Sequence, residues 1–292
     1  MTPTQPLHSF VPPRAPRAGW AWLRPVLLYS ATLILLFWTL APVLWIGIMS
    51  VQPEINYVSV PPRLSLNDFS LRWFAAMLAE ADFLNSLITS LIVASVTMFI
   101  CLFLGALAAY PLARLNVPHK NLFLALSVIG RMIPAMVLII PMFLLLRNLR
   151  LLDQYLGLII VYSTFLLPYV IWMLKNFFEQ VPPALESAAR MDGCSRLGSL
   201  FRVMIPVTAP GIVATAIFAF IGAWNEFLFG LILSTNRAVP VTVRLSALVS
   251  TTFHSDTSLV AAAGMLTLIP PVLLVFILNR FIIRGLVEGV KF

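Results

Sequence analysis

Six long runs of apolar residues that carry almost no charge constrain this chain more than any other feature. Each is longer than the about 20 residues that a helix needs to cross a bilayer. Inside a bilayer the backbone must satisfy its own hydrogen bonds, which favours helices for segments of this length. The runs are residues 25–53, 83–113, 121–146, 154–174, 207–236 and 257–279. We therefore expect an all-α integral membrane protein with six transmembrane helices.

The composition supports this interpretation and excludes a soluble domain. Hydrophobic residues make up 60% of the chain, charged residues only 10%, and the mean hydropathy is +0.97. The net charge of +8 does not indicate nucleic-acid binding, because no run of five or more basic residues occurs. The basic side chains lie instead in separate loops between the apolar runs, where they report topology.

The distribution of Lys and Arg predicts the orientation. Residues 1–24, 114–120, 175–202 and 280–292 hold 12 of them, whereas the loops on the other side hold 6. Because basic loops stay in the cytosol, both termini are expected to be cytoplasmic. Residues 1–19 are rich in proline and are expected to form a disordered cytoplasmic tail, followed by a single six-span domain at 20–292. The first run is too long for a signal peptide and is expected to be retained as a span.

Prolines and polar segments add detail. Residues 50–84 are polar and marked by prolines, and residues 73–78 at their end fit a helix lying on the membrane surface. Within the spans, prolines are expected to cause breaks that line a gate or curve the helices, at Pro134, Pro141, Pro168 and Pro270–Pro271.

The longest polar interruption of the apolar pattern is residues 182–211. Pro182 and Pro183 can only open a helix, and Gly193 accepts the left-handed backbone that ends it. Ser195 can then cap a second helix, so we expect a helix–turn–helix on the membrane surface. The expected apolar faces are Leu185, Ala188 and Ala189 on the first helix, and Leu197, Leu200, Phe201 and Met204 on the second.

This segment carries a resemblance to a known family. Ser187-Ala188-Ala189, three residues, Gly193, nine residues and then residues 203–206 resemble the E-A-A-x-x-x-G loop with its I-x-L-P end. That loop marks permease subunits of binding-protein-dependent ABC importers. The variant here is most similar to the carbohydrate branch, and to its second permease subunit, the partner of a larger first one. The resemblance implies the type I importer (MetI-like) permease fold, with a cytoplasmic coupling helix in a loop at 182–206.

The resemblance also implies which residues dock on a cytoplasmic ATPase subunit. They are Leu185, Glu186, Ser187, Ala188, Ala189, Arg190, Met191, Asp192 and Gly193. Small alanines suit this role, because they let another protein approach the helix closely. One departure concerns the family's Glu, which falls at Ser187 here, whereas Glu186 lies one residue earlier. The salt bridge inferred for the family's Glu therefore has no carboxylate at the matching position of this chain.

The partners implied by the resemblance are a second permease subunit forming a heterodimer, a cytoplasmic ATP-binding cassette ATPase dimer, an extracytoplasmic solute-binding protein and the lipid of a bacterial plasma (inner) membrane. No phosphate-binding G-x-x-x-x-G-K-[ST] loop occurs, so no cofactor is expected on this chain, and ATP and Mg belong to the partner ATPase. For the same reason the chain is not expected to be an enzyme. It is not expected to bind a metal ion either, because His8, His119 and His254 lie apart without ligand spacing. The solute is expected to be a sugar, oligosaccharide, polyol or glycerol phosphate ester.

Two charges lie inside the apolar runs, Arg131 and Glu226. A charge in a span normally faces water or a partner, because insertion costs about 2.5 to 3.5 kcal/mol. One interpretation places both on a pathway for a hydroxyl-rich solute, with Trp224 as a stacking face and Asn225 as a hydrogen-bonding group. The other is an ion pair, or a contact to the partner permease, that only fixes packing.

Two other classes of protein would each explain only part of this sequence. An ion- or proton-coupled secondary transporter would use Arg131 and Glu226 as a relay, but it leaves the 182–206 loop without a purpose. An integral membrane enzyme would need a clustered set of nucleophile, acid and base, and the sequence shows none. Transport that survives ATP depletion would favour the first of these alternatives.

Overall fold

The computed structural model describes residues 23–289, apart from residue 64 and residues 253–255. The expected tail at 1–19 lies outside these residues. The chain divides into two units, residues 1–48 and 49–292. The first unit holds nearly all of α1 (Leu23–Met49), a helix that is continuous through Pro42 and exposes its apolar side chains. Its length and composition fit a membrane span.

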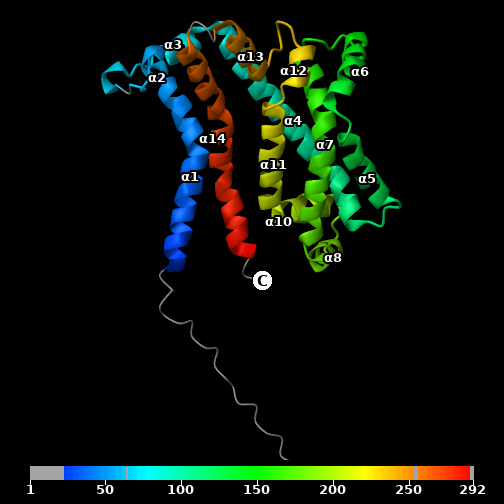
Figure 1. Ribbon diagram of the computed structural model, residues 1–292. Coiled ribbons are helices and arrows are strands. Elements are labelled where there is room, and N and C mark those ends of the chain that lie inside the picture. Colours follow the sequence, from blue (N-terminus) through cyan, green and yellow to red (C-terminus); the bar gives the residue numbers. More distant parts are fainter. Residues whose placement is uncertain (1–22, 64, 253–255, 290–292) are drawn as a thin grey trace, which may run out of the picture. The chain divides into compact units, whose positions relative to one another are not determined.

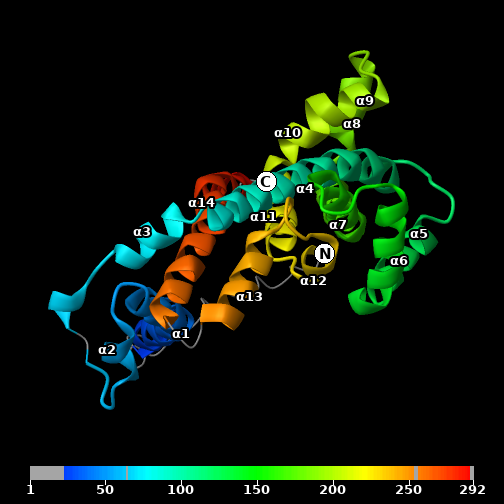
Figure 2. The ribbon, with the colours of Figure 1, turned by 90° about the horizontal axis from the view of Figure 1, so that it is seen from above.

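Four long helices form the core of the second unit: α4 (Ala81–Arg114), α7 (Tyr155–Gln180), α11 (Ala209–Trp224) and α14 (Thr257–Gly289). In this unit α4 packs against α7 and α11, and α11 also packs against α14 (Figure 1). Figure 2 shows the same helices from above, with α4 running past α14, α11 and α7. The side chains between them are fully buried, among them Cys101, Val170, Leu174 and Ala219.

The described residues contain four helices that are long and apolar enough to cross a membrane, and a fifth if a bent pair counts as one span. The all-α membrane fold is therefore confirmed, but the six-span count is not reproduced one for one. The run at 121–146 is divided into α5 (Lys120–Arg131) and α6 (Ala135–Asn148). Pro134 explains the break, because proline lacks the N–H of a helix bond and disfavours helical backbone in the residue before it.

The remaining prolines do not break their helices. The structure keeps α6 continuous through Pro141, α7 through Pro168, and α14 through Pro270 and Pro271. The expectation of breaks at these positions is wrong. A membrane helix tolerates the hydrogen bond that proline removes where neighbouring helices pack against it. Around Pro168 this packing is close, with Leu166 7% and Val170 0% exposed.

The fifth run is bent at both ends. Residues Arg196–Val207 meet α11 at an angle of 84°, with Thr208 at the corner. Pro210 fits this place, since the first helical turn needs no N–H donor there. Beyond α11, residues 225–227 interrupt the helix before the short α12 (Leu228–Leu233), and α13 (Val241–Thr252) follows. In Figure 1, α6, α12 and α13 lie at one end of the unit, and α8 and α10 lie at the other.

The polar segment before α4 contains three short elements, α2 (Glu54–Val58), η1 (Leu66–Asp68) and α3 (Arg72–Ala79). The helix expected at residues 73–78 is α3, and it buries Trp73 and Met77 while leaving its other face exposed. Trp73 Nε1 donates to Asp256 Oδ2 at 3.0 Å, and Tyr57 shares a hydrogen bond with Ser258 at 2.9 Å. These bonds attach the segment to the start of α14.

Asp153, between α6 and α7, binds the loop between α12 and α13. Its carboxylate accepts four consecutive backbone N–H groups, from Thr235, Asn236, Arg237 and Ala238, at 2.9 to 3.2 Å. Partial burial raises the pKa of Asp153, but these four hydrogen bonds outweigh it, and the pKa is lowered from its usual 3.8. The charged carboxylate is thus the form that holds the two loops together.

Replacing Asp153 by Asn is expected to lower stability by about 1 kcal/mol at neutral pH, a value discounted for a partly exposed group. The Asn side chain keeps one acceptor oxygen, but its NH2 group would face backbone N–H groups that are themselves donors. Because the folded pKa is lowered, the contribution of Asp153 is present above about pH 4 and is lost as pH falls through the folded pKa. Thermal unfolding in detergent at pH 7 and at about pH 3 tests this. The difference in unfolding temperature between the variant and the wild type should be smaller at the acidic pH.

A matched control is Asp82→Asn, which breaks the more exposed ion pair to Arg244 at 3.2 Å. It should change stability less than Asp153→Asn does. An equal effect of both variants would contradict the special role of the four-donor site.

Candidate functional site

The polar segment forms the predicted helix–turn–helix. Its first helix is α8 (Pro183–Met191), with Pro182 as N-cap, and its second begins as α9 (Arg196–Ser199). Gly193 has φ +87°, the left-handed backbone that the turn requires. Ser195 Oγ accepts the N–H of Gly198 at 3.1 Å, which confirms the predicted cap. After α9 the helix continues through a π-helical turn, η2 (Leu200–Met204), and α10 (Ile205–Val207).

The two helices bury only part of their apolar faces against the rest of the protein. On α8 only Ala189 is buried, whereas Leu185 and Ala188 are exposed. In the second part Leu200 and Met204 are fully buried, but Leu197 is 58% and Phe201 is 46% exposed. The protein therefore covers only part of each expected apolar face, and the rest of each face is exposed. The uncovered side of α8 and the turn after it expose Leu185, Ser187, Ala188, Arg190, Met191, Asp192 and Gly193.

Glu186 differs from these residues, because its carboxylate faces the end of α4. Tyr110 Oη donates to Glu186 Oε1, and Arg114 Nε lies 3.4 Å from Oε2, close enough for an ion pair but not aligned for a hydrogen bond. Arg114 Nη2 also donates to the carbonyl oxygen of Val181. Sequence reasoning missed Tyr110 and Arg114, although their spacing of four places both on one face of α4.

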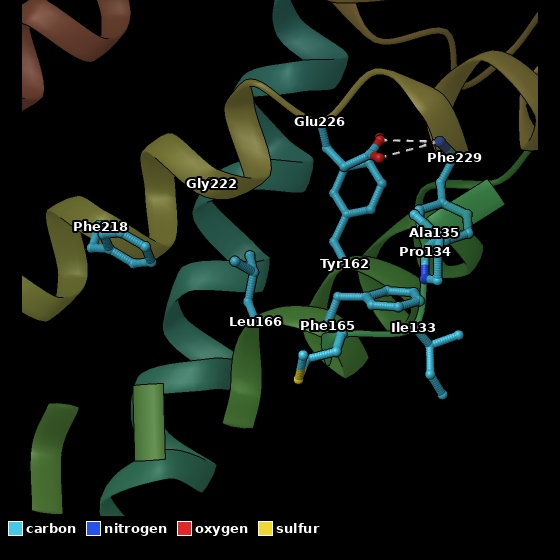
Figure 3. A pocket seen from close by; sticks show the side chains of 11 residues that line it. Ile133, Pro134, Ala135, Tyr162, Phe165, Leu166, Phe218, Gly222, Glu226 and Phe229 are labelled. Carbon is cyan, nitrogen blue, oxygen red and sulfur yellow. Dashed lines mark hydrogen bonds between the residues drawn. The ribbon is translucent and has the colours of Figure 1, made fainter. Parts of the chain in front are cut away.

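A cavity of ≈ 380 Å³ lies between α6, α7, α11 and α12. Its wall includes four aromatic side chains, Tyr162 and Phe165 from α7, Phe218 from α11 and Phe229 from α12 (Figure 3). Residues Met132, Ile133, Pro134, Ala135, Leu166, Gly222 and Glu226 complete it. The volume falls within the range of small-molecule sites, and the lining combines aromatic surface with one carboxylate.

Glu226 is the one predicted pathway residue whose side chain is described as lining this cavity. Its carboxylate accepts the N–H of Phe229 at 3.2 Å and that of Gly230 at 3.4 Å, so it caps the first turn of α12. Tyr162 points toward it (Figure 3), and its ring is 2% exposed. Among the described residues the Tyr162 hydroxyl has no partner that meets hydrogen-bond geometry, although Glu226 is its charged neighbour.

The other three predicted pathway residues lie elsewhere. Trp224 is 3% exposed and stacks on Phe220, with ring centroids 5.6 Å apart, so it offers no face to a solute in this cavity. Asn225 is exposed and lines a separate hollow of ≈ 360 Å³. Arg131 ends α5 directly before the cavity-lining Met132, and its side chain lies outside what the structure describes. The aromatic residues of the cavity carry no charge, so nothing in the apolar runs distinguishes them from other lipid-facing or core aromatics.

Long apolar helices, an uncovered polar helix–turn–helix at one end and an aromatic cavity between the helices define a multi-pass membrane transport subunit. The chain belongs to the family described as binding-protein-dependent transport system inner membrane component, whose model matches residues 101–288. This membership confirms the resemblance found in the loop at 182–206. The family is one of permease subunits rather than of enzymes.

Two relatives and one solved structure are similar over most of the chain. The sulfoquinovosyl glycerol transport system permease protein SmoH of Agrobacterium fabrum is 32% identical over 273 residues, which cover 89% of this chain and 92% of the relative. The trehalose transport system permease protein SugB of Mycobacterium tuberculosis is 34% identical over 257 residues, 86% and 92% of the two chains. A chain of a bacterial ABC transporter involved in importing the acidic polysaccharide alginate has a TM-score of 0.73 at 21% identity, over 91% of this chain and 98% of that one. The predicted permease fold is thus confirmed.

Proposed function

We propose that this chain is a permease subunit of an ATP-driven importer and moves a carbohydrate-like solute into the cytoplasm. The observation that carries the proposal is the uncovered face of α8, where Ser187 and Ala188 leave room for close approach by another protein. The related permeases of sulfoquinovosyl glycerol and trehalose systems support the solute class. A sugar, oligosaccharide, polyol or glycerol phosphate ester fits this class.

The coupling step follows from the position of α8. An ATPase dimer that holds this face would move α8 when it closes on ATP, and the movement would open the permease toward a loaded solute-binding protein. The nucleotide and its Mg would stay on the ATPase. A second permease subunit would complete the pathway as a heterodimer, because one chain leaves its apolar helices uncovered.

The orientation is part of the same proposal. Since ATP is hydrolysed in the cytosol, α8 must face the cytosol, in agreement with the greater number of basic residues in that segment and at the termini. The opposite end, with α12 and α13, would then receive the solute.

We place the pathway at the aromatic cavity rather than at Trp224. Aromatic rings cover the C–H faces of a sugar, and the Tyr162 hydroxyl and Glu226 carboxylate are polar groups for its hydroxyls. Arg131, which immediately precedes the cavity-lining segment, is proposed to face the same pathway. Trp224 and Asn225 are proposed to act through packing and through the neighbouring hollow.

The test is uptake by proteoliposomes that contain this chain with its partner permease and ATPase, supplied with the loaded binding protein. Radiolabelled trehalose, maltose and diacetylchitobiose form the panel. We expect uptake of one panel sugar that requires ATP and the ATPase, and labelling of Cys194 by a membrane-impermeant thiol reagent only from the side on which the ATPase binds. Uptake that an ion gradient sustains without ATP would instead support a secondary transporter.

A further inference from the structure

Glu186 stands apart from the rest of α8 because its side chain is turned toward the protein. That side chain is 13% exposed, whereas the residue before it, Leu185, is 45% exposed and Met191 is 89% exposed. Glu186 and the buried Ala189 are three residues apart and so share a face of the helix. A partner docked on the uncovered face would not reach the Glu186 carboxylate, because both of its oxygens are directed at α4.

Arg114 extends this network to two further segments. Its Nη2 donates to the carbonyl oxygen of Val181, which joins α7 to α8, and it lies 3.9 Å from Met204 Sδ in η2. The Arg114 side chain is 9% exposed, Val181 is 4% exposed and Met204 is 0% exposed. Charge-assisted bonds that are shielded from water hold their geometry firmly. The Arg114 guanidinium therefore connects the end of α4 to the chain segments that precede and follow α8.

The far end of α4 is also attached. Ser90 Oγ accepts the N–H of Val241 at 2.7 Å, and Asp82 forms an ion pair with Arg244 at 3.2 Å. Both partners belong to α13, at the end of the unit opposite α8 (Figure 1). A displacement of α8 can thus pass along the 34 residues of α4 to the other end of the protein.

We infer that Glu186 is a positioning residue that transmits movement from α8 to α4 through Tyr110 and Arg114, and that it is not a contact of the ATPase. The inference rests on the proposed function, since it divides the two faces of α8 between two tasks. The uncovered face, with Ser187 and Ala188, binds the ATPase. The covered face, with Glu186, converts the movement of the bound ATPase into movement of a transmembrane helix.

Two variants test this division in the reconstituted complex. Tyr110→Phe removes only the hydroxyl that donates to Glu186. Glu186→Gln keeps an acceptor for Tyr110 but removes the charge that faces Arg114. Both should retain the normal amount of ATPase subunit, yet trehalose, or the panel sugar that stimulates the wild type most, should be transported about tenfold less per ATP hydrolysed. That is the size expected for the loss of one charge-assisted hydrogen bond.

Glu179→Gln is the matched control, because it breaks a second Glu ion pair, to Lys175 at 2.8 Å, that lies within α7 alone. It should leave the transport-to-hydrolysis ratio unchanged. Loss of the ATPase subunit from both test variants would make Glu186 a docking residue and overturn the inference, and so would an unchanged ratio. If Glu186→Gln does not assemble, the milder Tyr110→Phe decides. A wild-type complex that moves no panel sugar with ATP would instead count against the proposed function itself.

Discussion

Purified complexes that carry Ala188→Glu are expected to lose the ATPase subunit while this chain still inserts and pairs with its partner permease. Ala188 lies on the uncovered face of α8, where a methyl group permits close approach. A carboxylate buried there without a partner would cost about 3 kcal/mol or more, which weakens binding by roughly a hundredfold. Subunit stoichiometry after purification in mild detergent measures the effect directly.

Ala188→Ser serves as the control, since serine is nearly as small and should keep the ATPase bound.

Gly193→Val should act like Ala188→Glu, because a β-branched side chain at φ +87° costs about 1 to 3 kcal/mol and misdirects α8 relative to α9. Gly193→Asn should be milder, as asparagine tolerates the left-handed region. Normal stoichiometry in both Ala188→Glu and Gly193→Val would remove the support for α8 as the docking helix.

The largest loss of stability is expected from Gly157→Ala at the start of α7. A Cβ atom at Gly157 would lie 2.2 Å from the carbonyl oxygen of Leu151 and 3.2 Å from its carbonyl carbon. The obstacle is backbone, so no side-chain rotation relieves it. Leu151 cannot easily move away either, because its own N–H donates to Leu146 O at 2.8 Å and Asp153 is held two residues later. We expect a loss of about 2 to 4 kcal/mol.

Thermal unfolding of the detergent-solubilised protein and its yield in the membrane measure this change. Gly264→Ala is the control, since no atom lies within 4 Å of a Cβ placed there and alanine favours helix. That variant should unfold at or slightly above the wild-type temperature. An unaltered unfolding temperature for Gly157→Ala would mean that the contact between the loop and α7 is looser than the structure indicates.

Local pattern determined much of this protein. Uncharged apolar runs predict membrane helices, because the bilayer excludes both charge and unpaired backbone. The turn at Gly193 and the cap at Ser195 depend on single residues and their immediate neighbours, and both were predictable. The spacing of small residues in 182–206 predicted the family, because all residues of this motif lie in one continuous segment of the sequence.

Tertiary structure decided which way side chains face, because facing depends on partners that are distant in the sequence. Glu186 is among the predicted docking residues, and the structure directs its carboxylate inward, toward Tyr110 and Arg114 more than 70 positions earlier. The ring of Trp224 stacks on Phe220, whereas the uncharged Tyr162 lines the cavity. Proline followed the same logic: Pro134 breaks its span, yet Pro168 does not, because helices packed around α7 stabilise a helix whose local sequence disfavours it.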